Sequence, residues 1–337
     1  MKYSAYLFLL LFLFSISCTP QNEVNIYSSR HYDTDNELYD GFTEETGIEI
    51  NLIEGSSDEL IERIRNEGIN SPADIVITVD AGRLWRAKEA NILQSYNSEL
   101  LENVIPDQLR DEDGYWVGLS ERIRGIIYNR ENVNPDDLQG YLELADSQWE
   151  GRVCVRSSNN IYNQSLTASL IETHGEERTE EWAEGLVRNF ARSPQGGDTD
   201  QIKAVAAGIC DVALANHYYL ARLIQSDSPQ DREVAESVGI YFPSAEFGGA
   251  HVNISGAGIA ANSPNIENAH RFLEYLATEE AQKIFALANN EFPVLEGVEF
   301  SEVLQQFGNY ESDAVNVSKY GENNPLAIRI MDRVGWR

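Results

Sequence analysis

Tyrosine is the residue type whose placement in this sequence most clearly indicates chemistry. Sixteen tyrosines occur among the 337 residues. Four of them lie just past the C-terminal end of an expected strand, namely Tyr32, Tyr162, Tyr218 and Tyr219. In open α/β sheets, ligands bind in the crevice beyond the carboxyl ends of the strands. Three separate segments therefore direct phenol groups toward what we expect to be one cleft.

A cluster of phenols favours a hard, highly charged metal ion. A free phenol has a pKa of about 10 and is neutral at pH 7. A trivalent ion displaces that proton, and the resulting phenolate is an anionic oxygen ligand that suits Fe³⁺ better than it suits softer metals. A single tyrosine is more often an ordinary amphipathic core or surface residue. The ferric hypothesis therefore depends on the four tyrosines acting together.

Three near-matches to known motifs each fail on a required feature. Residues 118–122 (GLSER) begin like a nucleophile elbow, but Arg122 replaces the closing glycine. Residues 256–261 (GAGIAA) fit a loose dinucleotide pattern but lack the βαβ context that such a site needs. Residues 33–38 begin like a calcium loop and end in leucine where glycine is required. We expect no enzyme, and a secreted hydrolase is the least favoured interpretation.

The elements that must position the tyrosines form two alternating blocks. The first, residues 24–90, reads as βαβαβ, which predicts a parallel sheet covered by helices. In it, Ser56 and Glu59 form a capping box at the start of the second helix. The second block has strand patterns at 153–155, 212–215, 239–242 and 251–261. Helices are expected around 163–173, 179–191 and 199–207, and another begins near His217. A helical stretch then runs from Pro264 through 289.

The length of the chain predicts two lobes, because 337 residues are more than one core usually covers. No Gly/Ser linker separates the blocks, which favours lobes joined by crossing strands. We expect crossings near 118–122, 241–245 and 289–293. The predicted N-terminal lobe is 22–120 plus 244–293, and the predicted C-terminal lobe is 121–243 plus 294–337.

The first residues predict export. Lys2, an apolar run from Ala5 to Phe14 and small residues after it form a signal peptide over residues 1–17, too short to span a bilayer permanently. Cys18 directly after small residues resembles a lipobox, although Ser15 stands where leucine is usual. We expect lipidation of Cys18, with ordinary cleavage near residue 17 as the alternative.

Charge and cysteine content agree with an exported protein. The 25 basic and 55 acidic residues give a net charge of −30, which argues against nucleic acid as a partner. A strongly acidic surface suits a protein from a salty habitat, where ions screen the repulsion between its charges; the alternative is that the charge serves only solubility. The remaining cysteines, Cys154 and Cys210, are expected to form a disulfide in an oxidising compartment; two reduced core thiols are the alternative.

Around these tyrosines the sequence resembles the bacterial ferric-iron-binding periplasmic proteins, particularly their tyrosine-rich cyanobacterial-type branch. The resemblance covers about residues 22–337. It is marked by residues 27–32 (YSSRHY), 155–163 (VRSSNNIYN), 208–219 (GICDVALANHYY), 291–294 (EFPV) and 325–333 (PLAIRIMDR).

The resemblance implies an α/β, two-lobed type II periplasmic-binding fold that closes by hinge motion. It implies that Tyr32, Tyr162, Tyr218 and Tyr219 ligate Fe³⁺, with His31 as a candidate fifth ligand. Arg122 and Arg222 fall where the family keeps basic residues, which would offset excess phenolate charge and orient the ligands. We treat His217 as structural. A synergistic carbonate or phosphate is less needed here but stays open.

We therefore expect a monomeric, non-enzymatic solute-binding protein of the periplasm or cell surface. Fe³⁺ would be its cargo, delivered to an ABC-type iron permease in the inner membrane. A binding protein for an anion or a small organic solute is the alternative.

Overall fold

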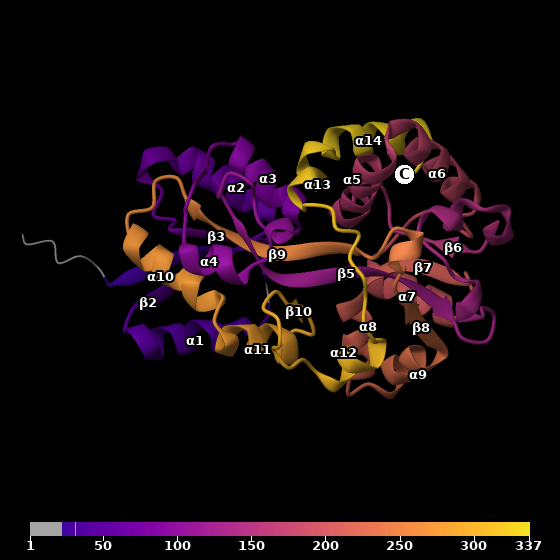
Figure 1. The fold of residues 1–337 in the computed structure, drawn as a ribbon. Helices are drawn as coiled ribbons and strands as arrows, with labels where there is room; N and C mark the ends of the chain where they lie inside the picture. Colours follow the sequence, from indigo (N-terminus) through magenta and orange to yellow (C-terminus); the bar gives the residue numbers. More distant parts are fainter. Residues whose placement is uncertain (1–21, 31) are drawn as a thin grey trace, which may run out of the picture.

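The computed structural model describes residues 22–30 and 32–337. The predicted signal peptide, Cys18 and His31 lie outside the described residues. A ten-stranded mixed sheet runs through the described chain, with β2-β1-β3-β9-β5-β7-β6 as its main strand order (Figure 1).

The first part of the chain forms the expected βαβαβ unit. Strands β1, β2 and β3 are parallel, with Ile26 of β1 paired to Leu52 and Ile75. Ser56 and Glu59 form the capping box of the second helix, as predicted. The unit consists of β1 (Glu23–Ser28), α1 (Asp35–Thr46), β2 (Glu49–Glu54), α2 (Ser57–Glu67) and β3 (Ile75–Val79).

Two long antiparallel strands join the two halves of the molecule. They are β5 (Val117–Asn129) and β9 (His251–Ala260), and Figure 1 shows them running side by side from one half into the other. Toward one end β9 pairs with β3, and toward the other β5 pairs with β7 (Val212–Asn216) and β8 (Val238–Tyr241).

The expected crossings agree with the structure in part. Residues 118–122 lie in β5, and β10 (Phe292–Pro293) pairs with β5 within 289–293. The segment 241–245 does not cross, because Tyr241 still pairs with β5 and the return is made later by β9. Every residue of β9 is buried, as a strand between two sheet neighbours requires. The exact lobe boundaries stay a prediction.

The second half contains the remaining strand–helix units. The two-residue strand β6 (Val153–Cys154) is parallel to β7, and a disulfide joins Cys154 to Cys210 with 5.8 Å between their Cα atoms. The expected helices are present as α5 (Ile161–His174), α6 (Glu176–Arg188), α7 (Asp198–Ala206) and α8 (His217–Ile224). A further helix, α9 (Pro229–Ser237), was not expected; it lies between α8 and β8.

The helical stretch predicted from Pro264 through 289 is two helices. These are α10 (Ile266–Leu276) and α11 (Glu279–Ala288), divided where the Thr278 side chain accepts a hydrogen bond from the backbone N–H of Ala281. The other elements are α3 (Ala81–Glu89), β4 (Leu93–Gln94), α4 (Glu99–Val104), α12 (Glu302–Phe307), α13 (Ser318–Glu322) and α14 (Asn324–Arg333).

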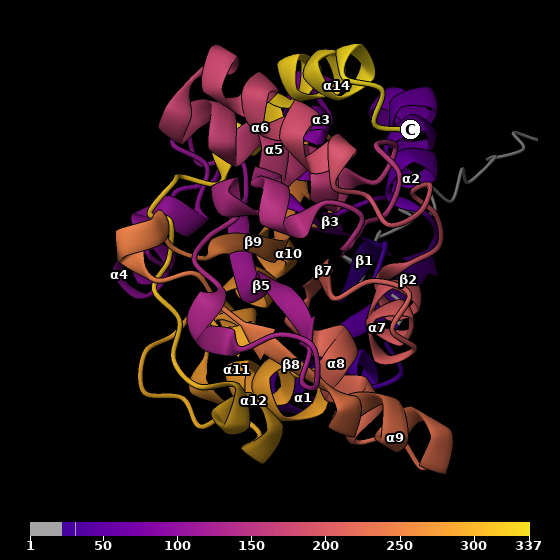
Figure 2. The ribbon, with the colours of Figure 1, turned by 90° about the vertical axis from the view of Figure 1, so that its right-hand side faces the viewer.

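Helices cover both faces of the central strands. Figure 2 shows α5, α6 and α14 on one side of them and α8, α9 and α11 on the other. The structure thus has the α/β arrangement expected of this sequence. Among residues 22–30 and 32–337, no helix is both long enough and apolar enough to cross a bilayer.

Candidate functional site

Three of the four predicted tyrosines lie in the first turns of two helices. Strand β7 ends at Asn216, and α8 begins one residue later, so Tyr218 and Tyr219 follow the strand end directly. Their rings are 4.5 Å apart between centroids. Tyr162 is the second residue of α5, which follows β6 after a short loop. The positions past the strand ends are those that the sequence predicts.

Arg122 of β5 joins Tyr162 to Tyr218. Its guanidinium Nη2 donates a hydrogen bond to the Tyr218 hydroxyl and contacts the Tyr162 hydroxyl at 3.4 Å. The guanidinium carbon is 4.5 Å from the Tyr218 ring centroid and 5.4 Å from that of Tyr162. Arg122 is only 2% exposed, so its charge acts in a medium of low dielectric constant.

Arg222 of α8 joins the fourth tyrosine to this group. Its guanidinium carbon is 4.6 Å from the Tyr32 ring centroid, 5.1 Å from that of Tyr218 and 5.8 Å from that of Tyr219. Tyr32 comes from the loop between β1 and α1, in the other half of the molecule. The structure therefore brings the four tyrosines of three distant segments together, with Arg122 and Arg222 between them.

The surroundings of the tyrosines shift their pKa values in different directions. Burial raises the pKa of Tyr218 and of Tyr219 above the ordinary value, and the neighbouring phenols raise it further. Burial also acts on Tyr162, but the charge of Arg122 and a hydrogen bond with Tyr218 together outweigh it and lower the pKa of Tyr162. The Tyr162 phenol is thus more acidic than those of Tyr218 and Tyr219.

A buried carboxylate, not anticipated from the sequence, holds Arg122 in place. Glu291 Oε1 is 3.5 Å from Arg122 Nε, and its Oε2 is 2.9 Å from Arg30 Nη1. Glu291 also accepts hydrogen bonds from Ser120 and Ser255. Burial would raise the pKa of Glu291, but the two arginines outweigh it and lower this pKa to about 2. Glu291 is therefore an anion that bridges the two halves of the molecule.

His217 is a packing residue, as expected. It is fully buried, its Nε2 is 2.8 Å from the backbone oxygen of Asn290, and its Nδ1 accepts from the backbone N–H of Ile123 at 3.0 Å. Burial lowers its pKa to about 4. In the part of the chain that the structure describes, no group of three or more His, Cys, Asp or Glu side chains could hold a metal ion.

Comparison with known proteins assigns the chain to a family. Residues 70–311 match the family model described as bacterial extracellular solute-binding protein. Iron uptake protein A1 of Synechocystis sp. is 52% identical over 324 residues, which cover 96% of this chain and 90% of the relative. The chain belongs to the iron uptake protein A family.

Solved structures of the family have the same fold. A Trichodesmium protein in complex with iron and citrate is 58% identical, with a TM-score of 0.92, over 94% of this chain and all of that one. A ferric binding protein from Campylobacter jejuni is 40% identical, with a TM-score of 0.87, over 93% of this chain and all of that one. Both the family and the α/β periplasmic-binding fold expected from the sequence are confirmed, and the family is one of solute-binding proteins rather than enzymes.

Proposed function

We propose that this chain binds ferric iron through the phenolates of Tyr32, Tyr162, Tyr218 and Tyr219 and delivers it to an uptake transporter. The observation that supports this best is the convergence of four tyrosines on two arginines with no competing carboxylate, thiol or imidazole cluster among residues 22–30 and 32–337. The relatives support iron as the cargo: one is named an iron uptake protein, one a ferric binding protein, and one was solved in complex with iron and citrate.

Charge balance supports this ligand set. Four phenolates carry one negative charge more than Fe³⁺ neutralises. Arg122 and Arg222 contact the phenol rings, so their charges offset this excess without competing for the ion. His31, next to Tyr32, remains a candidate fifth ligand outside the described residues. Tyr162 would ionise more readily than Tyr218 or Tyr219, because Arg122 and the hydrogen bond with Tyr218 lower its pKa.

The proposed setting is outside the cytoplasmic membrane. The family model describes extracellular solute-binding proteins, and such proteins deliver their cargo to a permease, here an ABC-type iron permease. Removal of residues 1–17 and lipidation of Cys18 complete the proposal. Cleavage would make Cys18 the first residue of the mature chain, and its lipid would keep the protein close to that partner.

Ferric titration of Tyr218→Phe/Tyr219→Phe tests the proposal. Loss of two anionic ligands should weaken ferric affinity by more than about 100-fold, beyond the about 10- to 100-fold typical of losing an outer contact. Tyr241→Phe is the matched control, because Tyr241 is half-buried at the end of β8, away from the cluster. Unchanged ferric affinity in the double variant would favour the alternative, a binding protein for an anion or a small organic solute.

A further inference from the structure

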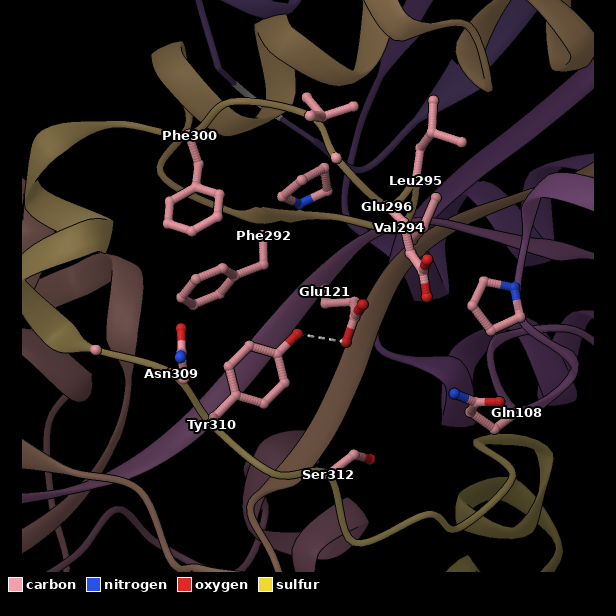
Figure 3. A pocket seen from close by; sticks show the side chains of 15 residues that line it. Gln108, Glu121, Phe292, Val294, Leu295, Glu296, Phe300, Asn309, Tyr310 and Ser312 are labelled. Carbon is pink, nitrogen blue, oxygen red and sulfur yellow. Dashed lines mark hydrogen bonds between the residues drawn. The ribbon is translucent and has the colours of Figure 1, made fainter.

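A cavity lies on the opposite face of β5 from the tyrosine cluster. It has a volume of ≈ 630 Å³, and Glu121 of β5 lines it (Figure 3). Successive side chains of a strand point to opposite faces. Ser120 and Arg122 face Glu291 and the tyrosines, so Glu121 points away from them. The cavity is therefore separate from the proposed iron site.

Both halves of the molecule contribute to this cavity. Pro106 and Gln108 lie on one side, and the segments 292–298 and 308–310 enclose the rest, together with Phe300 and Ser312. Figure 3 shows Glu121, Glu296 and Gln108 around the same space, with the aromatic side chains at its other end. Its volume falls within the range of about 300–1,000 Å³ that is usual for small-molecule sites.

Three aromatic rings form one wall. Phe292 is 5.5 Å from Phe300 and 4.9 Å from Tyr310 between ring centroids, with interplanar angles of 70° and 59°. Because the rings are inclined to one another, their faces point in different directions along the wall of the cavity. The face of an aromatic ring carries negative potential and attracts organic cations.

The ionisable groups that line the cavity are two carboxyls and a phenol. Glu121 is partly buried and accepts a hydrogen bond from the Tyr310 hydroxyl at 2.8 Å. Burial raises the pKa of Glu121 to about 7, although this hydrogen bond acts in the opposite direction. Glu296 adds a second, exposed carboxylate. None of the lining residues is Lys, Arg or His.

We propose that this cavity binds a small monovalent organic cation, such as a quaternary or protonated amine. Aromatic faces beside a carboxylate are the recognised combination for such ligands. A metal ion would need more oxygen ligands than two carboxylates in an aromatic cavity of this size provide. An anion would meet Glu121 and Glu296 without a compensating base. The proposal goes beyond ferric binding and does not depend on it.

Calorimetric titration of the mature protein with choline tests the proposal, with 3,3-dimethylbutan-1-ol as the neutral probe of the same shape. Choline should bind at least about tenfold more tightly than the alcohol. Glu121→Gln should weaken choline binding by about tenfold, and Phe300→Leu by several-fold. The matched control is Glu299→Gln, which removes an exposed charge between two lining residues without altering the lining.

Three results would each overturn the proposal of a cation site. Equal affinity for choline and the alcohol, no binding of choline, or an equal loss with Glu299→Gln and Glu121→Gln would overturn the proposal. Ferric affinity, measured in parallel, should be unchanged in Glu121→Gln and in Phe300→Leu because the two sites occupy opposite faces of β5. If Glu121→Gln fails to fold, Phe300→Leu still tests the aromatic wall.

Discussion

The two halves of the molecule contribute to the tyrosine cluster in different ways. Tyr162 and Tyr218 are in helix first turns and contact Arg122, and Tyr218 also accepts a hydrogen bond from Asn216 at 3.2 Å. Tyr32 lies in a loop and contacts the guanidinium groups of Arg30 and Arg222, with no side-chain hydrogen bond to any described residue. Tyr162, Tyr218 and Arg122 in one half therefore form a fixed group, called the platform below. The other half supplies a single phenol, Tyr32, which is less constrained.

This difference suggests an order of events in capture. The fixed tyrosines pay little ordering entropy when they ligate an ion, so they would bind it first. Tyr32 would then close over the ion as the halves move about β5 and β9. Glu291 is central to this arrangement, because it pairs with Arg30 beside Tyr32 and with Arg122 beside the platform.

The largest effect is expected from Glu291→Gln. Removing this carboxylate leaves the buried Arg122 without a carboxylate partner and Arg30 with Asp35 alone, which costs about 3–5 kcal/mol of unfolding free energy. Urea denaturation measures the loss, with Glu302→Gln on the exposed side of α12 as the control. A loss no larger than that of the control would show that Glu291 does not tie the two halves together.

Glu291→Gln should also change how the unfolding free energy depends on pH. The pKa of Glu291 is lowered from an ordinary value of 4.5 to about 2, so its contribution is complete above pH 4.5 and is lost as the pH falls toward 2. The wild-type protein should lose this stability over that window. Glu291→Gln should show a shallower fall there.

Arg122→Gln should weaken ferric affinity by about 10- to 100-fold, because Arg122 orients Tyr162 and Tyr218 without ligating the ion. Arg65→Gln, a change on the exposed face of α2, is the control. Competition with a chelator gives both affinities. Equal affinity of Arg122→Gln and the wild type would mean that the platform does not need its central arginine.

Tyr32→Phe should weaken ferric affinity less than Tyr162→Phe does, by about tenfold or less. Its main effect should be faster release, since Tyr32 would be the last ligand to close and the first to open. Stopped-flow transfer of iron to a chelator measures the release rate. Equal losses in the two variants would contradict the division into platform and closing residue.

The smallest effect on iron binding is expected from Cys154→Ser/Cys210→Ser. The disulfide constrains a 56-residue separation in the unfolded chain, so its loss should cost about 2–4 kcal/mol of unfolding free energy. The disulfide lies in the apolar core against which Tyr219 packs and offers no ligand to the ion, so ferric affinity should change less than about threefold. Thermal unfolding and ferric titration of the same variant separate the two effects, and a large loss of affinity would show that the platform depends on the disulfide.

Local sequence patterns predicted much of the fold and the tyrosine cluster. The capping box at Ser56 and the tyrosine pair after β7 are read from neighbouring residues, so the sequence suffices for them. Glu291 could not be assigned in the same way, because its partner Arg30 is 261 residues away. The late crossing by β9 was also missed, since strand pairing depends on distant partners rather than on local alternation.

The central claim is that phenolates hold ferric iron, and visible absorption tests it most directly. Adding Fe³⁺ to the purified protein should produce a phenolate-to-iron charge-transfer band, because ligation displaces the phenol protons. The band should disappear in Tyr218→Phe/Tyr219→Phe and persist in Tyr241→Phe. A wild-type protein that binds ferric iron and stays colourless would contradict the account.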